Sequence, residues 1–123
     1  MNNFKELAEV FLPKGILDYF YFLRVEKEIE QKDKKENEVI IIHLEEKEDP
    51  PEIPAEHKGK RIISKGFKNI TVEDFPVRGR KVRLKIKRRV WKIEEVKERI
   101  KKDIPITFSN TKLEKEFGFF FEG

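Results

Sequence analysis

The sequence predicts an α+β fold, in which a small antiparallel sheet of four to five strands is combined with an N-terminal helix and a helical C-terminal segment. Apolar and charged residues alternate over residues 21–29 and again over residues 81–91, which is the period of a strand with one buried face. Near both ends of the chain, apolar residues instead recur at spacings of three and four, the period of an amphipathic helix. An antiparallel sheet with helices on one face would bury both kinds of apolar stripe.

The N-terminal helix is predicted from residues 4–11, which keep helical spacing and begin with a capping-box pattern formed by Asn3 and Glu6. Pro13 ends this helix, and residues 16–20 add a further turn. We interpret the aromatic residues of this region as core and not as a base-stacking platform, because the adjoining acidic segment would repel nucleic acid. These are Phe11, Tyr19, Phe20, Tyr21 and Phe22.

Two strands follow and form a predicted hairpin. The first covers residues 21–29, and the second covers residues 39–47, the most apolar strand of the chain. The polar segment Gln31–Asn37 between them predicts a loop of medium length. The acidic run Glu45–Asp49 is interpreted as solvated charge and not as a magnesium site, because its carboxylates lie on a strand end and a loop.

The middle of the chain predicts a connection and two short strands. Residues 49–54 contain three prolines, which favour a stiff, extended segment. Residues 61–67 and 69–75 each have strand character, with Gly66 as a bend or bulge.

The C-terminal part is predicted to be helical. Apolar residues at helical spacing in residues 93–100 predict a helix that ends before Pro105, and Thr111 with Glu114 forms a second capping-box pattern. The chain then places three phenylalanines, residues 119–121, close to its end. We expect them to dock on a catalytic domain, on a second copy of the chain or on the chain's own core, in that order of preference, because large apolar side chains are rarely left in water.

The chain has the length of one ordinary domain, 123 residues. We expect residues 1–92 to form a single α+β domain and residues 93–123 a helical extension that links to a separately encoded catalytic domain. The sequence has no cysteine, and His43 and His57 have no second ligand at metal spacing, so no cofactor or metal is expected. With no leader-like or membrane-spanning stretch, the expected location is cytoplasmic.

Charge divides the chain into two unlike halves. Residues 1–57 carry 8 basic and 15 acidic side chains, a net charge of −7, while residues 58–123 carry 20 and 9, a net charge of +11. A positive field confined to one half is typical of proteins that bind a polyanion.

The most basic stretch is itself a predicted strand. Nine of the fifteen residues from Arg78 to Lys92 are Lys or Arg. Aliphatic residues alternate with this charge, so one face would be apolar and the other basic; they are Val82, Leu84, Ile86 and Val90. The basic face consists of Lys81, Arg83, Lys85, Lys87 and Arg89, with Trp91 at the end of the row.

This basic row has two interpretations. A charged strand face is most often a solvated outer surface. We favour binding of a phosphate backbone, because five like charges on one face repel each other unless an anion offsets them.

Residues 70–92, ITVEDFPVRGRKVRLKIKRRVWK, resemble part of the N-terminal region of insertion-sequence transposases that carry a later DDE catalytic domain. The matching residues are Ile70, Asp74, Pro76, Gly79, Val82, Leu84, Arg88 and Arg89. That region is zinc-finger-like in many members, but here Lys92, Pro51 and Pro54 stand at or near the positions where cysteines are usual. The resemblance is therefore to a cysteine-free relative, and zinc is not implied.

The resemblance implies that the chain binds transposon-end DNA as the non-catalytic part of a transposase, associated with the nucleoid. The expected nucleic-acid-binding residues are Arg78, Gly79, Arg80, Lys81, Arg83, Lys85, Lys87, Arg88, Arg89 and Trp91. For Trp91 we favour an anchoring role over base stacking. Two alternatives use the same strand: an RNA-binding or ribosome-associated module, and a protein-interaction or oligomerisation domain that binds an acidic partner.

Overall fold

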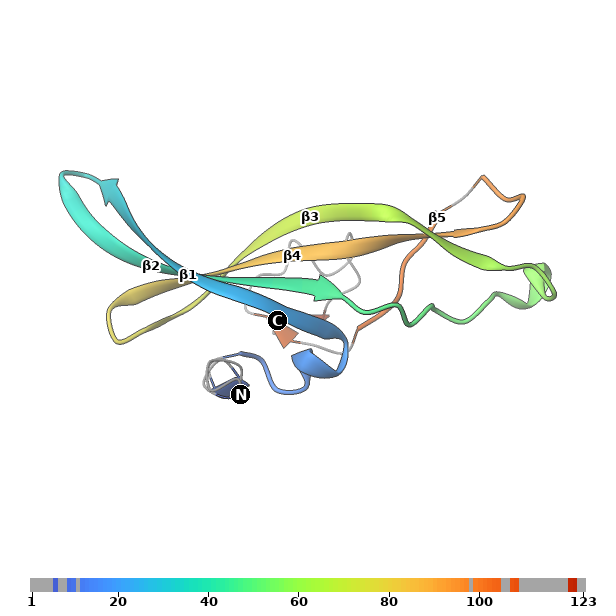
Figure 1. The fold of residues 1–123 in the computed structure, drawn as a ribbon, viewed down its shortest axis with the longest axis horizontal. Coiled ribbons are helices and arrows are strands. Elements are labelled where there is room, and N and C mark those ends of the chain that lie inside the picture. The colour runs from blue at the N-terminus through green and yellow to red at the C-terminus, as the bar shows by residue number, and fades with distance from the viewer. Residues whose placement is uncertain are drawn as a thin grey trace.

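The chain is mostly β-sheet in the part that the structure, a computed structural model, describes: residues 6, 9–10, 12–97, 99–104, 107–108 and 120–121. Four long strands and one short strand form the main sheet (Figure 1). They are β1 (Phe20–Lys32), β2 (Lys35–Glu46), β3 (Ile62–Val77), β4 (Arg80–Ile93) and β5 (Arg99–Ile100). The predicted α+β class is therefore wrong.

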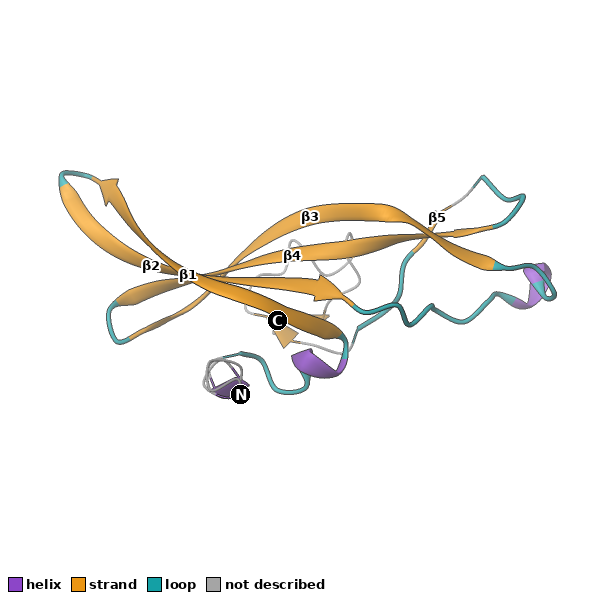
Figure 2. Ribbon diagram, viewed as in Figure 1, coloured by secondary structure: helices purple, strands orange, loops and turns teal. Residues whose placement is uncertain are grey.

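Helical structure is limited to short pieces (Figure 2). The complete helical elements among the described residues are two 3-10 turns, η1 (Ile16–Asp18) and η2 (Ala55–His57). Of the predicted N-terminal helix, Glu6, Glu9 and Val10 are helical, and the other residues lie outside the described part. The turn predicted at residues 16–20 is confirmed by η1.

The helix predicted at residues 93–100 is wrong. Ile93 is the buried last residue of β4, and Glu95 has a left-handed backbone with a φ of 70°, which a right-handed helix does not tolerate. Residues 99–100 form β5, which pairs with Trp91 and Lys92 of β4. The edge of β4 is available there because its pairing with β2 stops at Lys87. Pairing to this open edge outweighs the helical spacing of the side chains.

The sheet is mixed and not antiparallel. Its strand order is β1-β2-β4-β3, and β2 and β4 run parallel, in register from Val39 opposite Lys81 to Glu45 opposite Lys87. Two antiparallel hairpins, β1–β2 and β3–β4, thus lie side by side. The predicted antiparallel sheet is therefore wrong, and the parallel pairing at the centre could not be read from the alternation of side chains.

Both hairpins close with two-residue turns. The turns are Asp33–Lys34 and Arg78–Gly79, and all four residues have positive φ, between 49° and 78°. Positive φ at both central residues is the type I′ geometry, whose twist matches that of the flanking strands. The medium-length loop predicted at Gln31–Asn37 is wrong, because these polar residues continue β1 and β2 up to the turn.

β3 is one long strand where the sequence predicts two short ones. Its pairing with β4 shifts register between Ser64 and Phe67, and Gly66 there has a φ of 99°. The bulge predicted at Gly66 is confirmed, and the strand continues through it.

The core lies on one face of this sheet. Aliphatic side chains of the inner strands β2 and β4 and of the edge strand β3 form it. Leu12, Ile16 and Ile104 cover these side chains from outside the sheet. Ile104 is fully buried there, so the chain after β5 packs on this core.

The described C-terminal residues form a second, two-stranded parallel sheet. β6 (Thr107–Phe108) pairs with β7 (Phe120–Phe121). The capped helix predicted from Thr111 lies outside the described residues, as do the side chains of the three terminal phenylalanines.

Gly79→Ala is expected to lower the free energy of unfolding by about 1–2 kcal/mol. The reason is backbone strain alone: the φ of Gly79 is 78°, and a Cβ added there would meet no atom within 4 Å. The neighbouring Arg78 also has a positive φ of 49°, so Arg78→Gly should be neutral or stabilising. Urea unfolding of both variants checks this, and equal losses in both would contradict the turn geometry.

Candidate nucleic-acid interface

The predicted basic row lies on the face of the sheet opposite the core, called here the outer face. β4 is an inner strand, so the row runs down the middle of this face with β2 on one side and β3 on the other. Its members are Lys81, Arg83, Lys85, Lys87 and Arg89. Their neighbours decide how much of their charge is available to a ligand.

At the end nearest the Arg78–Gly79 turn, carboxylates of the same chain neutralise the row. The Arg83 guanidinium donates to Glu73 Oε1 (2.5 Å) and to Glu30 Oε2 (3.0 Å), and Lys81 Nζ lies 3.6 Å from Glu30. The hydrogen bond from Arg83 lowers the pKa of Glu30, and the bond to Glu73 raises the pKa of Arg83.

These ion pairs pass over β2, because Glu30 belongs to β1 while Lys81 and Arg83 belong to β4. Val39 and Ile41 lie beneath them on the outer face of β2 and are 0% and 1% exposed. The long charged side chains thus serve as a lid over apolar surface on this face.

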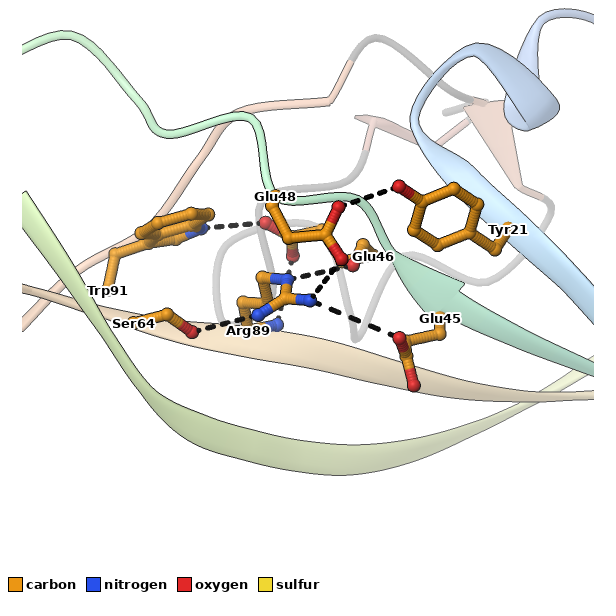
Figure 3. A network of polar contacts seen from close by, with 7 residues as sticks. All are labelled: Tyr21, Glu45, Glu46, Glu48, Ser64, Arg89 and Trp91. Atoms are coloured by element: carbon orange, nitrogen blue, oxygen red, sulfur yellow. Dashed lines mark hydrogen bonds and ion pairs between the residues drawn. The ribbon is translucent and has the colours of Figure 1, made fainter.

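At the opposite end, Arg89 is held by several groups (Figure 3). Its guanidinium donates to Glu48 Oε1 (3.0 Å), to Ser64 Oγ (3.1 Å) and to the carbonyl oxygen of Glu46 (2.9 Å). Glu48 also accepts a hydrogen bond of 2.6 Å from the Tyr21 hydroxyl, which lowers the pKa of Glu48 and raises the pKa of Tyr21.

Arg88 and Trp91 are bound to a buried carboxylate and are not available to a ligand. Both donate to the carboxylate of Glu46, from Arg88 Nε to Oε1 and from Trp91 Nε1 to Oε2, each at 2.7 Å. Glu46 is 1% exposed and Arg88 5%, and burial lowers the pKa of Arg88 in spite of the carboxylate beside it. Arg88 also donates to the Lys102 carbonyl oxygen (2.6 Å), and Trp91 is itself only 4% exposed.

The acidic run at the end of β2 is not simply solvated charge. Glu46 is buried with Arg88, Glu48 binds Arg89, and Asp49 binds the Lys102 ammonium. The alternation of side chains and the composition cannot reveal these ion pairs, because the pairs depend on the register that sets β2 beside β4.

The remaining predicted site residues lie at the hairpin turn. Arg78 and Gly79 form the turn itself, and Arg80 Nε donates to Glu38 Oε2 at 2.5 Å. The charge of Arg80 is therefore partly neutralised by Glu38. Arg78 and Gly79 are exposed at one tip of the sheet.

Two lysines in the middle of the row differ from the rest. Lys85 and Lys87 are exposed and form no ion pair with any residue that the structure describes. They line a hollow of about 420 Å³ on the outer face, which we call the trough. Its polar lining consists of Arg24, His43, Asn69, Thr71, Lys85 and Lys87.

No carboxylate belongs to the residues that line the trough. The nearest acidic partner of its cations is Glu26, which accepts from Arg24 Nε (3.0 Å) and lies 2.5 Å from His43 Nε2. The hydrogen bond from Arg24, followed by that from His43, lowers the pKa of Glu26. Lysine ammonium groups beside amide and hydroxyl side chains, in a hollow without acids, are suited to an anionic ligand.

An exposed aromatic ring adjoins the trough. Phe67 is 42% exposed and lies opposite Arg89 in the β3–β4 pairing. Its ring centroid is 4.8 Å from Arg89 Cζ and 6.0 Å from Lys87 Nζ. Sequence reasoning missed Phe67 together with Arg24, Asn69 and Thr71, because only the strand register sets them beside the basic row.

No family model, curated protein or solved structure matches this chain. The residues described by the structure contain no group of three histidine or carboxylate side chains that could hold a metal ion. No helix among them is long and apolar enough to cross a membrane.

Arg88→Met is expected to lower the free energy of unfolding by about 3–5 kcal/mol, because it leaves the Glu46 carboxylate buried without its cation. Arg80→Met is the matched control: it also removes one arginine of β4 from a carboxylate of β2, but that pair is exposed and its loss should cost less than about 1 kcal/mol. Urea unfolding followed by far-UV circular dichroism measures both. Similar losses in the two variants would contradict the role assigned to burial.

Acid is expected to weaken the ion pairs that involve Glu30. The pKa of this carboxyl is lowered in the folded state, so its contribution to stability is complete above the unfolded pKa of about 4.3 and is lost as the pH falls through the lower folded pKa. In Glu30→Gln the free energy of unfolding should fall less steeply below about pH 4 than in the unsubstituted chain. Glu28→Gln, on the same strand and without a described ion pair, should not change this dependence; an identical change in both variants would refute the assignment.

Proposed function

We propose that this chain is a non-catalytic DNA-binding module, the N-terminal region of an insertion-sequence transposase, and that it binds the phosphate backbone through the trough. The observation that carries the proposal is the isolation of Lys85 and Lys87, two exposed ammonium groups in a hollow without carboxylates. The rest of the row is already bound to acids of the same chain.

The spacing of the two lysines supports phosphate binding. Residues two apart on one strand face lie about 6.6 Å apart. Phosphates of one DNA strand follow each other at about 3.4 Å of helix rise, so the two ammonium groups span about two steps. Asn69 lies opposite Lys87 and Thr71 opposite Lys85, so each lysine has a polar side chain beside it that can donate to a phosphate oxygen.

The identity of the DNA and of the protein partner is proposed from the resemblance of residues 70–92 to transposases. The DNA would be the transposon ends, and a separate DDE catalytic domain, with which this chain would act in the nucleoid, would cleave the strands. Backbone contacts alone carry little sequence information, so we expect binding through the trough to be largely tolerant of sequence.

Lys85→Gln combined with Lys87→Gln is expected to weaken binding to a 20-base-pair duplex and to lower the slope of log affinity against log salt concentration by up to about 2. The control is Lys58→Gln with Lys60→Gln, which removes the same charge from exposed lysines outside the trough. Fluorescence anisotropy at several salt concentrations measures both variants.

Three results would count against the proposal. Equal slopes in the two double variants would remove the trough from the binding site. Tighter binding of a hairpin RNA than of duplex DNA would favour the RNA-binding alternative. Salt-dependent self-association with no affinity for nucleic acid would favour the protein-interaction alternative.

A further inference from the structure

Phe67 is an exposed aromatic side chain that takes no part in the hydrophobic core. It lies on the outer face of β3, while the core occupies the other face, and it does not belong to the buried cluster. β3 is the edge strand of the sheet among the described residues, so none of the strands that the structure describes lies beyond it to cover the ring. The bulge at Gly66 directly precedes Phe67, and bulges commonly re-aim a side chain.

The surroundings of the ring are cationic. Arg89 lies over it at 4.8 Å and Lys87 at 6.0 Å from the centroid, and the exposed Lys65 precedes the bulge. Arg89 is fixed by Glu48 and Ser64, so the guanidinium beside the ring does not depend on the ring for its position. An aromatic ring held next to cations in this way offers a stacking surface for a group that is both planar and anionic.

Three cross-strand pairs continue this surface into the trough. They are Phe67 opposite Arg89, Asn69 opposite Lys87 and Thr71 opposite Lys85, all on the outer face. A ligand that lies along them meets one aromatic ring and then two pairs that each combine a lysine with a polar side chain.

We propose that Phe67 and the trough together bind single-stranded DNA, with an unpaired base stacked on the Phe67 ring and the adjoining phosphates on Lys87 and Lys85. The inference rests on the proposed function and deepens it by naming the form of nucleic acid. In a duplex the base faces are covered by their neighbours, and a ring beside the backbone has nothing to stack on. A single strand exposes its base faces next to its phosphates, which matches the order of groups along β3 and β4.

The test compares a labelled 12-nucleotide single strand of DNA with the 12-base-pair duplex of the same sequence, by fluorescence anisotropy on the full chain. The unsubstituted protein should bind the single strand more tightly. Phe67→Leu, which keeps an apolar side chain and removes the aromatic face, should weaken single-strand binding about tenfold and leave duplex binding within about twofold. Phe67→Trp should restore single-strand binding.

Ile29→Ala is the control. Ile29 is an apolar side chain of β1 that is exposed like Phe67 (63% against 42%), but it lies opposite Glu38, away from Arg89 and the trough. This variant should bind the single strand as the unsubstituted protein does. In Phe67→Trp, the new tryptophan should also be quenched by the single strand, against the background of Trp91, which is only 4% exposed.

The outcomes separate this inference from the proposed function. If the duplex is bound through Lys85 and Lys87 but Phe67→Leu has no effect on single-strand binding, the inference is wrong and the proposed function stands. If Phe67→Leu weakens both forms equally, Phe67 supports the surface and does not stack on a base, which also overturns the inference. If the unsubstituted protein binds neither form, both proposals are wrong.

Discussion

The carboxylate of Glu46, the last residue of β2, receives three donors from β4: the Arg88 side chain, the Arg89 backbone amide and the Trp91 indole. This is the place where β2 leaves the sheet and β5 takes over the edge of β4. A buried charge is costly unless its partners are complete, so the contact tolerates few other arrangements of the two strands. It fixes the parallel β2–β4 pair, and with it the positions of both hairpins.

The acidic residues of the first half of the chain form ion pairs mainly with basic residues of the second half. Glu30 from the acidic half meets Lys81 and Arg83, and Glu45 and Glu48 meet Arg89. The repulsion expected along a five-membered basic row is thus relieved by the chain's own acids at both ends. Within the part of the chain that the structure describes, only Lys85 and Lys87, at the centre of the row, keep charge that a ligand could bind. The strand is basic along its whole length, but the site that it offers is small.

The positions that carry the resemblance to transposases have mostly structural roles here. Ile70, Val82 and Leu84 are core residues, Gly79 forms a turn, and Arg88 holds Glu46. The side chains proposed to contact nucleic acid lie between these positions or on other strands, so they do not belong to the shared pattern. Such a pattern describes how the strands are built, whereas recognition depends on the side chains that the strands present.

The sequence by itself determined the strand character of β1, β2 and β4, the bulge at Gly66 and the split of β4 into an apolar and a basic face, because each depends on residues that are close along the chain. It did not determine the parallel β2–β4 pair, the strand at Arg99–Ile100 or the buried role of Arg88. It also did not reveal that Phe67 lies beside the trough. These features depend on which distant strands pair and in which register, and a one-residue shift would turn every side chain to the other face.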